Sequence, residues 1–153
     1  LEKKVLEKFE ITPLVLPYYI NQNPQDNFYF AVEKSNFTPN SKRTDGSYTK
    51  YSSIDDKIDG FFHYTRWIKF GVGRAMMESS QEIRNGHITT EEGQALIKRF
   101  EGEYPKKYEK EFLDYISMSR EEFLKLCDSF RSPHLWKVQD GYWKLRYMPN
   151  NLI

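Results

Sequence analysis

Between Ile54 and Phe130, apolar residues recur at steps of three and four, and glycines interrupt them at intervals. This spacing restricts the fold more than any other feature, because it places apolar side chains along one face of an α-helix. The predicted helices cover residues 54–84, 90–101, 105–116 and 120–130. The sequence therefore predicts a mainly α fold.

Capping signals define the ends of these helices. The pairs Thr89–Glu92 and Ser119–Glu122 each fit a capping box, in which a hydroxyl and a carboxylate satisfy backbone N–H groups at a helix start. Ser53 is expected to cap the first helix, and Asn85–Gly86 to end it. Asp140–Gly141, between two short apolar runs, predicts a C-terminal β-hairpin.

The N-terminal residues give weaker signals. Residues 1–10 have the spacing of a short amphipathic helix, and the chain begins inside this run, as a fragment would. Two prolines flank Leu14–Leu16, so that stretch is expected to be extended rather than helical. Phe28–Val32 fits either a strand or the start of an aromatic-rich helix, because periodicity does not decide in so short a run.

A long polar segment, residues 35–53, separates these elements from the helical region. Loops of this length inside compact domains are usually functional or disordered. We expect residues 36–153 to form a helical C-terminal domain, and residues 1–35 to be the remnant of, or the junction to, a preceding domain.

Charge and cysteine content exclude several classes of protein. The net charge of +1 gives no field that would attract nucleic acid or a membrane surface. No run of apolar residues is long enough to span a membrane, so membrane insertion is not expected. The single Cys127 makes neither an internal disulfide nor a cysteine zinc site, and no metal site is predicted. These features fit a cytoplasmic protein.

The segment Lys69–Arg74 is the first candidate for ligand binding. Gly71 and Gly73 would each cost a helix about 1 kcal/mol relative to alanine, and they permit close approach of a ligand or of another backbone. Lys69 and Arg74 are suited to phosphate groups. Close packing of two helices explains the glycines equally well. The two basic residues converge on one anion only if the glycines break the helix between them.

A second candidate segment joins the long loop to the first predicted helix and contains Lys50 and Asp56. Asp56, Asp59 and His63 lie at helical steps, so a paired-carboxylate or metal role is conceivable, although simple helix capping is commoner.

A third candidate lies at the end of the first predicted helix, where Glu82 and Arg84 are placed to contact a ligand. A plain helix stop at Asn85–Gly86 is the alternative. No nucleophile with its base is recognised, so the catalytic residues stay unknown.

Several of these segments together resemble one protein family. In their order and spacing they are similar to the C-terminal half of the N-acetyl sugar amidotransferases, from about Asn36 onward. The segments are Tyr51–Gly60, Ile68–Ala75, Gln81–Thr89, Arg99–Pro105 and Phe130–Trp136.

The resemblance implies an α/β enzyme of the PP-loop ATP pyrophosphatase group, of which this chain is the helical C-terminal region. Such enzymes use ATP with Mg²⁺ to activate an acetamido oxygen on a nucleotide sugar. Ammonia from a glutaminase partner then displaces AMP and leaves an acetamidino group. The sugar enters lipopolysaccharide O-antigen or a related nonulosonic acid. Lys50, Asp56, Lys69, Gly71, Gly73, Arg74, Glu82 and Arg84 remain our candidates for substrate or phosphate binding.

The family's Ser-Gly-Gly-x-Asp-Ser loop and its cysteine pairs are absent from these 153 residues. Residues 1–35 are therefore expected to adjoin a missing ATP-binding domain, and an apolar patch there is expected to favour a homo-oligomer. The alternative is a non-catalytic helical protein-interaction module.

We predict that this chain alone has no ATP pyrophosphatase activity, because it contains no glycine-rich loop that would cradle a pyrophosphate. Purified chain incubated with ATP and Mg²⁺ should release neither AMP nor pyrophosphate in a coupled assay. Release of both products that follows the chain through successive purification steps would contradict this.

Overall fold

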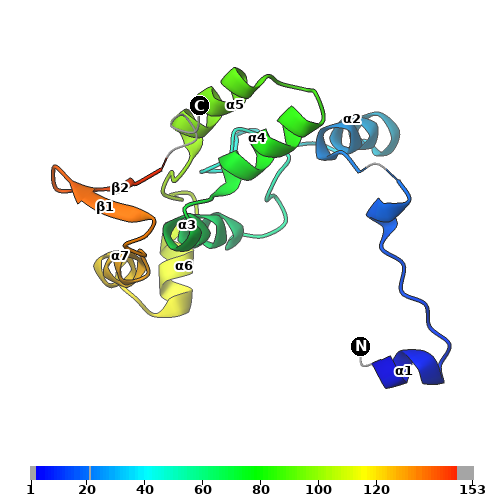
Figure 1. Ribbon diagram of the computed structural model, residues 1–153, viewed down its shortest axis with the longest axis horizontal. Coiled ribbons are helices and arrows are strands. Elements are labelled where there is room, and N and C mark those ends of the chain that lie inside the picture. Colours follow the sequence, from blue (N-terminus) through cyan, green and yellow to red (C-terminus); the bar gives the residue numbers. More distant parts are fainter. Residues whose placement is uncertain (1–2, 21, 148–153) are drawn as a thin grey trace. The chain divides into compact units, whose positions relative to one another are not determined.

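The computed structural model describes residues 3–20 and 22–147 and divides into two compact units, residues 1–37 and 38–153 (Figure 1). The described part contains seven α-helices and one two-stranded sheet. The predicted mainly α fold is therefore confirmed. The proposed role of residues 1–35 as a junction stays a prediction.

The first unit contains three short elements. They are α1 (Lys3–Lys8), the 3₁₀ turn η1 (Leu16–Tyr18) and α2 (Pro24–Ser35). The N-terminal helix is confirmed for the described residues, and Val15 is extended as expected, although Leu16 already belongs to η1. Phe28–Val32, for which the sequence allowed either a strand or a helix, is helical. Asn23 caps α2 through its side chain, and Pro24 occupies the first turn.

The described part of the second unit contains five helices and a hairpin. They are α3 (Asp59–Phe70), α4 (Arg74–Arg84), α5 (Thr90–Phe100), α6 (Glu109–Ile116), α7 (Arg120–Ser129), β1 (Trp136–Gln139) and β2 (Tyr142–Leu145). Both capping boxes are formed, at the starts of α5 and α7. Helix α4 packs alongside α5 (Figure 1), and α3 contacts both α4 and α7.

Two predicted helix starts are wrong. Ser53 has a φ of 55°, in the left-handed region, so it does not cap a helix, and α3 begins only at Asp59. The chain before it makes a turn, in which Oδ1 of Asp56 accepts the Ile58 N–H at 2.6 Å. The helix predicted from Pro105 begins only at Glu109. The N–H groups of Lys106 and Lys107 before it donate to the Asp45 carboxylate, which holds this backbone in a turn.

The predicted helix over 54–84 is split at its glycine pair. Gly71 adopts a φ of 72° and ends α3, with its N–H donating to the Trp67 carbonyl at 2.7 Å. A side chain would strain this left-handed backbone, and glycine does not. Gly73 then serves as the N-cap of α4. Arg84 ends α4, and Gly86 follows in the left-handed region, as predicted.

The core of the second unit is largely aromatic. Phe61 of α3 and Phe112 of α6 stack with centroids 3.8 Å apart, and both meet Phe123 of α7 edge-on. Ile68 is buried in the same cluster, and its carbonyl accepts the indole N–H of Trp136 at 2.7 Å. This bond ties the hairpin to α3 and satisfies the polar end of a buried tryptophan.

The C-terminal hairpin has the predicted turn. Gln139 pairs with Tyr142, and the two residues between them, Asp140 and Gly141, have φ values of 55° and 79°. Positive φ at both positions is the signature of a type I′ turn, which matches the twist of antiparallel strands. In the described residues, no helix combines the length and apolar character that crossing a membrane requires.

We predict unequal costs for alanine at two left-handed glycines. A Cβ at Gly102 (φ 74°) would collide with the Trp67 indole, whereas a Cβ at Gly86 (φ 75°) would meet nothing within 4 Å. Gly86→Ala should therefore lower the free energy of unfolding by only about 1 kcal/mol, which is the cost of a left-handed backbone at alanine. Gly102→Ala should lose roughly 1–3 kcal/mol more from overpacking. Urea denaturation measures both, and equal losses would contradict the packing of Trp67 on Gly102.

Candidate functional site

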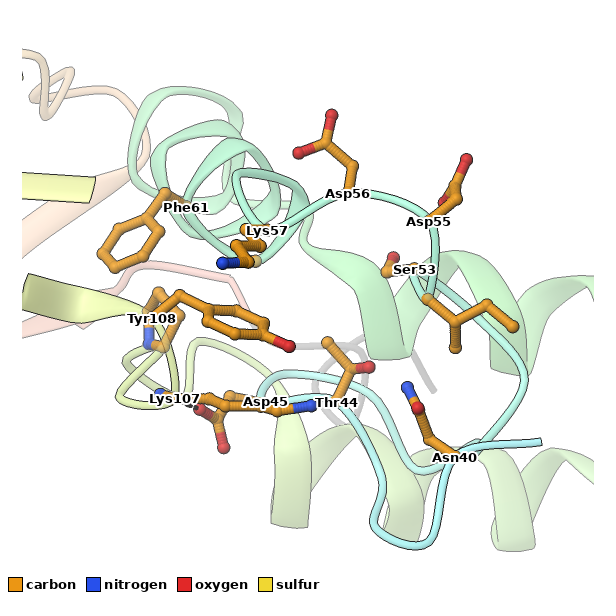
Figure 2. Close-up of a pocket in the computed structure, with 13 residues that line it drawn as sticks. Asn40, Thr44, Asp45, Ser53, Asp55, Asp56, Lys57, Phe61, Lys107 and Tyr108 are labelled. Carbon is orange, nitrogen blue, oxygen red and sulfur yellow. Dashed lines mark hydrogen bonds between the residues drawn. The ribbon is translucent and has the colours of Figure 1, made fainter. Parts of the chain in front are cut away.

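A pocket of about 220 Å³ opens between the long loop, the start of α3 and the turn before α6 (Figure 2). It lies wholly within the second unit. Its lining residues are Asn40, Thr44, Asp45, Ser53, Ile54, Asp55, Asp56, Lys57, Gly60, Phe61, Pro105, Lys107 and Tyr108.

One wall of the pocket is fixed by an ion pair. Arg43 binds Glu103 through two parallel hydrogen bonds of 2.5 and 2.8 Å, and Glu103 also accepts the N–H of Gly46 at 2.9 Å. A forked arginine–carboxylate pair is specific in geometry as well as strong. The Arg43 guanidinium lowers the pKa of Glu103 below its usual value, so the carboxylate stays ionised at neutral pH.

A second anchor joins the loop to the turn before α6. Oδ2 of Asp45 accepts the N–H groups of Lys106 and Lys107, at 2.7 and 3.3 Å. These bonds hold the backbone in a turn, which explains why α6 begins at Glu109 and not near Pro105. Both anchors thus join the loop to the segment between α5 and α6.

Within the loop, two bonds hold its arms together. The Asn40 N–H donates to the Lys50 carbonyl at 3.0 Å, and the Thr44 hydroxyl donates to the Ser52 carbonyl at 3.1 Å. The side chain of Lys50 is exposed and is not among the lining residues of this pocket. Lys50 thus contributes its carbonyl to the loop, while ligand binding by its side chain stays a prediction.

The interior of the pocket presents neutral polar groups around an aromatic ring. Figure 2 shows the Tyr108 ring crossing the pocket, with the side chains of Asn40, Thr44 and Ser53 around the space beyond its hydroxyl. The hydroxyl of Ser53 is buried without a hydrogen-bond partner among the described residues. Such hydroxyl and amide groups, next to a ring face, suit a polyol or an amide ligand.

Five charged residues also line the pocket, and one of them, Asp45, accepts the N–H groups of Lys106 and Lys107. Lys57 binds Glu111 at 2.6 Å and lies 5.4 Å from the Tyr108 ring centre, and Lys107 lies 4.9 Å from it. Asp55 and Asp56 are exposed, and Figure 2 shows their carboxylates turned outward from the pocket. Asp56, a predicted site residue, therefore lies at the pocket and also holds the turn into α3.

A buried polar cluster lies behind the loop and joins it to α3 and α4. Nε2 of His63 faces a guanidinium nitrogen of Arg74 at 2.6 Å, and Arg74 also binds Glu78 at 2.8 Å. Glu78 accepts the hydroxyl of Ser47 at 2.7 Å, and that hydroxyl lies 3.0 Å from the Thr49 hydroxyl. Arg74 is therefore held by protein groups.

The charge state of His63 follows from this surrounding. Burial and the positive charge of Arg74 lower its pKa to about 4, although Asp59 opposes the shift. A neutral ring accepts from Arg74 at Nε2, which puts the proton on Nδ1. Asp59 and His63 do lie close, with Oδ2 3.8 Å from Nε2, whereas Asp56 lies before the helix and does not share their face.

The glycine pair next to Arg74 is explained by close approach of the chain itself. A Cβ at Gly71 would lie 3.2 Å from Leu145, and a Cβ at Gly73 would lie 3.0 Å from the Glu101 carboxylate. Glu101 accepts the N–H of Gly73 and, at 3.0 Å, the N–H of Met76. It thereby occupies the N-terminus of α4, where an anion would otherwise bind. Burial raises the pKa of Glu101.

The remaining predicted residues are spread over the second unit. Lys69 is exposed, lies 5.3 Å from the Phe70 ring centre, and lines a different cavity from Arg74. The expected convergence of these two side chains on one anion is therefore absent, although the helix does break between them. Glu82 is buried, which raises its pKa, and Arg84 is exposed at the end of α4. Their contact with substrate stays a prediction.

The second candidate segment, residues 48–60, contains Ser53 and five more of the lining residues, but sequence reasoning missed Asn40, Thr44 and Tyr108. The one available signal was the unusual length of the polar loop over residues 35–53. Tyr108 gave no signal of its own, because it looked like one more core aromatic of a helix.

We predict that stability falls as the pH is lowered from about 6.5 to 4, partly because of His63. Its folded-state pKa of about 4 is below the unfolded value, so the unfolded chain binds the proton first and is favoured in this window. His63→Gln should reduce the loss of unfolding free energy between about pH 6.5 and pH 4 by up to about 3 kcal/mol. Exposed His134→Gln is the matched control. Chemical denaturation at several pH values measures the slope, and an unchanged slope in His63→Gln would contradict the assignment.

Comparison with known families identifies the domain. Residues 45–148 match the family described as LPS biosynthesis protein WbpG-like, C-terminal domain. The match spans the pocket-forming loop from Asp45, all five helices of the second unit and the hairpin. A search of curated proteins gave no match. The chain therefore belongs to the WbpG-like C-terminal domain family of lipopolysaccharide biosynthesis proteins.

Proposed function

We propose that this chain is the C-terminal domain of an ATP-dependent N-acetyl sugar amidotransferase that acts on a nucleotide sugar in O-antigen biosynthesis. Membership in a lipopolysaccharide biosynthesis family supports the pathway, and the resemblance of Tyr51–Gly60 and the later segments supports the reaction. In this proposal the enzyme works in the cytoplasm. ATP activates the acetamido oxygen, and ammonia from a glutaminase partner displaces AMP.

The observation that carries the proposal is the neutral, ring-lined interior of the loop pocket. An acetamido sugar presents hydroxyls, an amide and an apolar ring face, and it carries no charge. Hydroxyl and amide groups of Asn40, Thr44 and Ser53 can exchange hydrogen bonds with such a ligand, and the Tyr108 ring can cover its apolar face. At the pocket edge, the ammonium group of Lys107 suits the diphosphate of a nucleotide sugar.

In this proposal, ATP does not bind to the described residues. The N-terminus of α4, the best candidate for a phosphate, accepts the Glu101 carboxylate instead. In that part of the chain, no three His, Cys, Asp or Glu side chains are grouped so as to hold a metal ion. The proposal therefore assigns ATP and Mg²⁺ to the PP-loop domain that the resemblance implies, and assigns sugar binding to this domain. The alternative, an interaction module, finds support in a groove described in the next subsection.

We predict that the chain binds a uridine diphosphate N-acetyl sugar and that Tyr108→Ala weakens this binding about tenfold, through the lost ring contact. Titration followed by ¹⁵N-resolved NMR should shift the amide signals of residues 40–57 and 105–108. Tyr115→Ala is the matched control, because Tyr115 is exposed on α6 and is not among the pocket-lining residues. Absence of saturable shifts, or equal affinity of the two variants, would contradict the proposed site.

A further inference from the structure

A second and larger cavity, of about 530 Å³, lies between α3 and α7. It shares no lining residue with the loop pocket. Ile68, Phe123 and Cys127 are buried at its floor, whereas its walls are exposed aromatic and aliphatic side chains. The wall residues are Phe62, Phe70, Leu126 and Phe130, with exposed fractions of 56%, 58%, 42% and 53%. Four large apolar side chains around one groove are more than scattered surface residues.

The lining residues form two helical rows. On α3 they are residues 62, 65, 66, 68, 69 and 70, and on α7 and its C-cap they are residues 123, 126, 127 and 130. Both sets follow steps of three and four, so each row is one face of its helix. The furrow between two such rows receives the ridge of a third helix. An extended peptide would instead need a free strand edge for its backbone hydrogen bonds, which two helices do not offer.

The charge at the rim restricts the occupant further. Arg66 and Lys69 are the charged residues among the described lining, and both are basic. Lys69 lies over the Phe70 ring, and Arg66 contacts the sulfur of Met77. Neither contact neutralises its charge. A helix bound here would therefore gain from carboxylates beside its apolar stripe.

We propose that the α3–α7 groove binds an amphipathic helix of a partner protein, with apolar residues at steps of three and four and acidic residues beside them. The groove fits about two helical turns, because its lining spans residues 62–70 on α3 and 123–130 on α7 and its C-cap. This inference concerns a surface apart from the sugar pocket and does not depend on the proposed reaction.

The test uses a fluorescent acidic peptide of about three to four helical turns, with leucine at every third or fourth position and glutamate elsewhere. We expect saturable binding to the full chain by fluorescence anisotropy. Phe70→Glu and Leu126→Glu should each weaken it at least about tenfold, because they place a carboxylate against an apolar surface and the peptide's own glutamates. Lys125→Glu is the matched control. Lys125 is exposed on α7 and does not line the groove. Circular dichroism verifies that each variant is folded.

Reversal of the two basic charges at the rim tests how much they contribute to peptide affinity. The double variant Arg66→Glu/Lys69→Glu should lose about tenfold in affinity for the acidic peptide and gain affinity for the same peptide with lysine in place of glutamate. A scrambled acidic peptide, of equal composition but without helical spacing, should bind at least about tenfold more weakly to the unchanged chain.

Several results would overturn the proposal. They are absence of saturable binding, equal binding of the scrambled peptide, and equal affinity of the Phe70→Glu variant. Sedimentation would assign the groove to a second copy of the chain if self-association were lost in Phe70→Glu. Anionic phospholipid vesicles would assign it to a membrane surface if they bound the chain and not this variant. Either assignment excludes the partner helix.

Discussion

The positions of α3, α4 and α5 depend on one carboxylate, that of Glu101 at the end of α5. It accepts two N–H groups from the first turn of α4, where Gly73 is buried and the groups would otherwise lack partners. An unsatisfied buried N–H costs about 1–3 kcal/mol. Because α4 also carries Arg74 and Glu78, this cap fixes the polar cluster that reaches Ser47 in the loop.

The segment between α5 and α6 links the Glu101 cap of α4 to the loop pocket. Two residues after Glu101, Glu103 holds Arg43, and the following backbone binds Asp45. Gly102 lies between the two glutamates in a left-handed conformation and lets the Trp67 indole pack against it. One turn therefore positions a helix on one side and the loop pocket on the other.

The second unit presents two surfaces of opposite chemistry. The loop pocket is polar and neutral inside, with Tyr108 as its ring surface, which suits a small hydroxylated ligand. The α3–α7 groove is apolar with a basic rim, which suits a helix. Both surfaces use α3, because its start borders the pocket and its later turns form the groove. The two proposed roles, sugar binding and docking of a partner helix, therefore use separate surfaces.

Local signals in the sequence determined the helices, both capping boxes and the hairpin turn, since each depends on residues within a few positions of one another. The sequence by itself also indicated the family. Only the tertiary structure decided what approaches Gly73, because a ligand and the distant Glu101 would leave the same glycine signal. It also decided the helix starts after Ser53 and Pro105, and the pocket around Tyr108. The start of α6 and the pocket around Tyr108 depend on contacts between residues some sixty positions apart, such as Asp45 with Lys106, which no local pattern records.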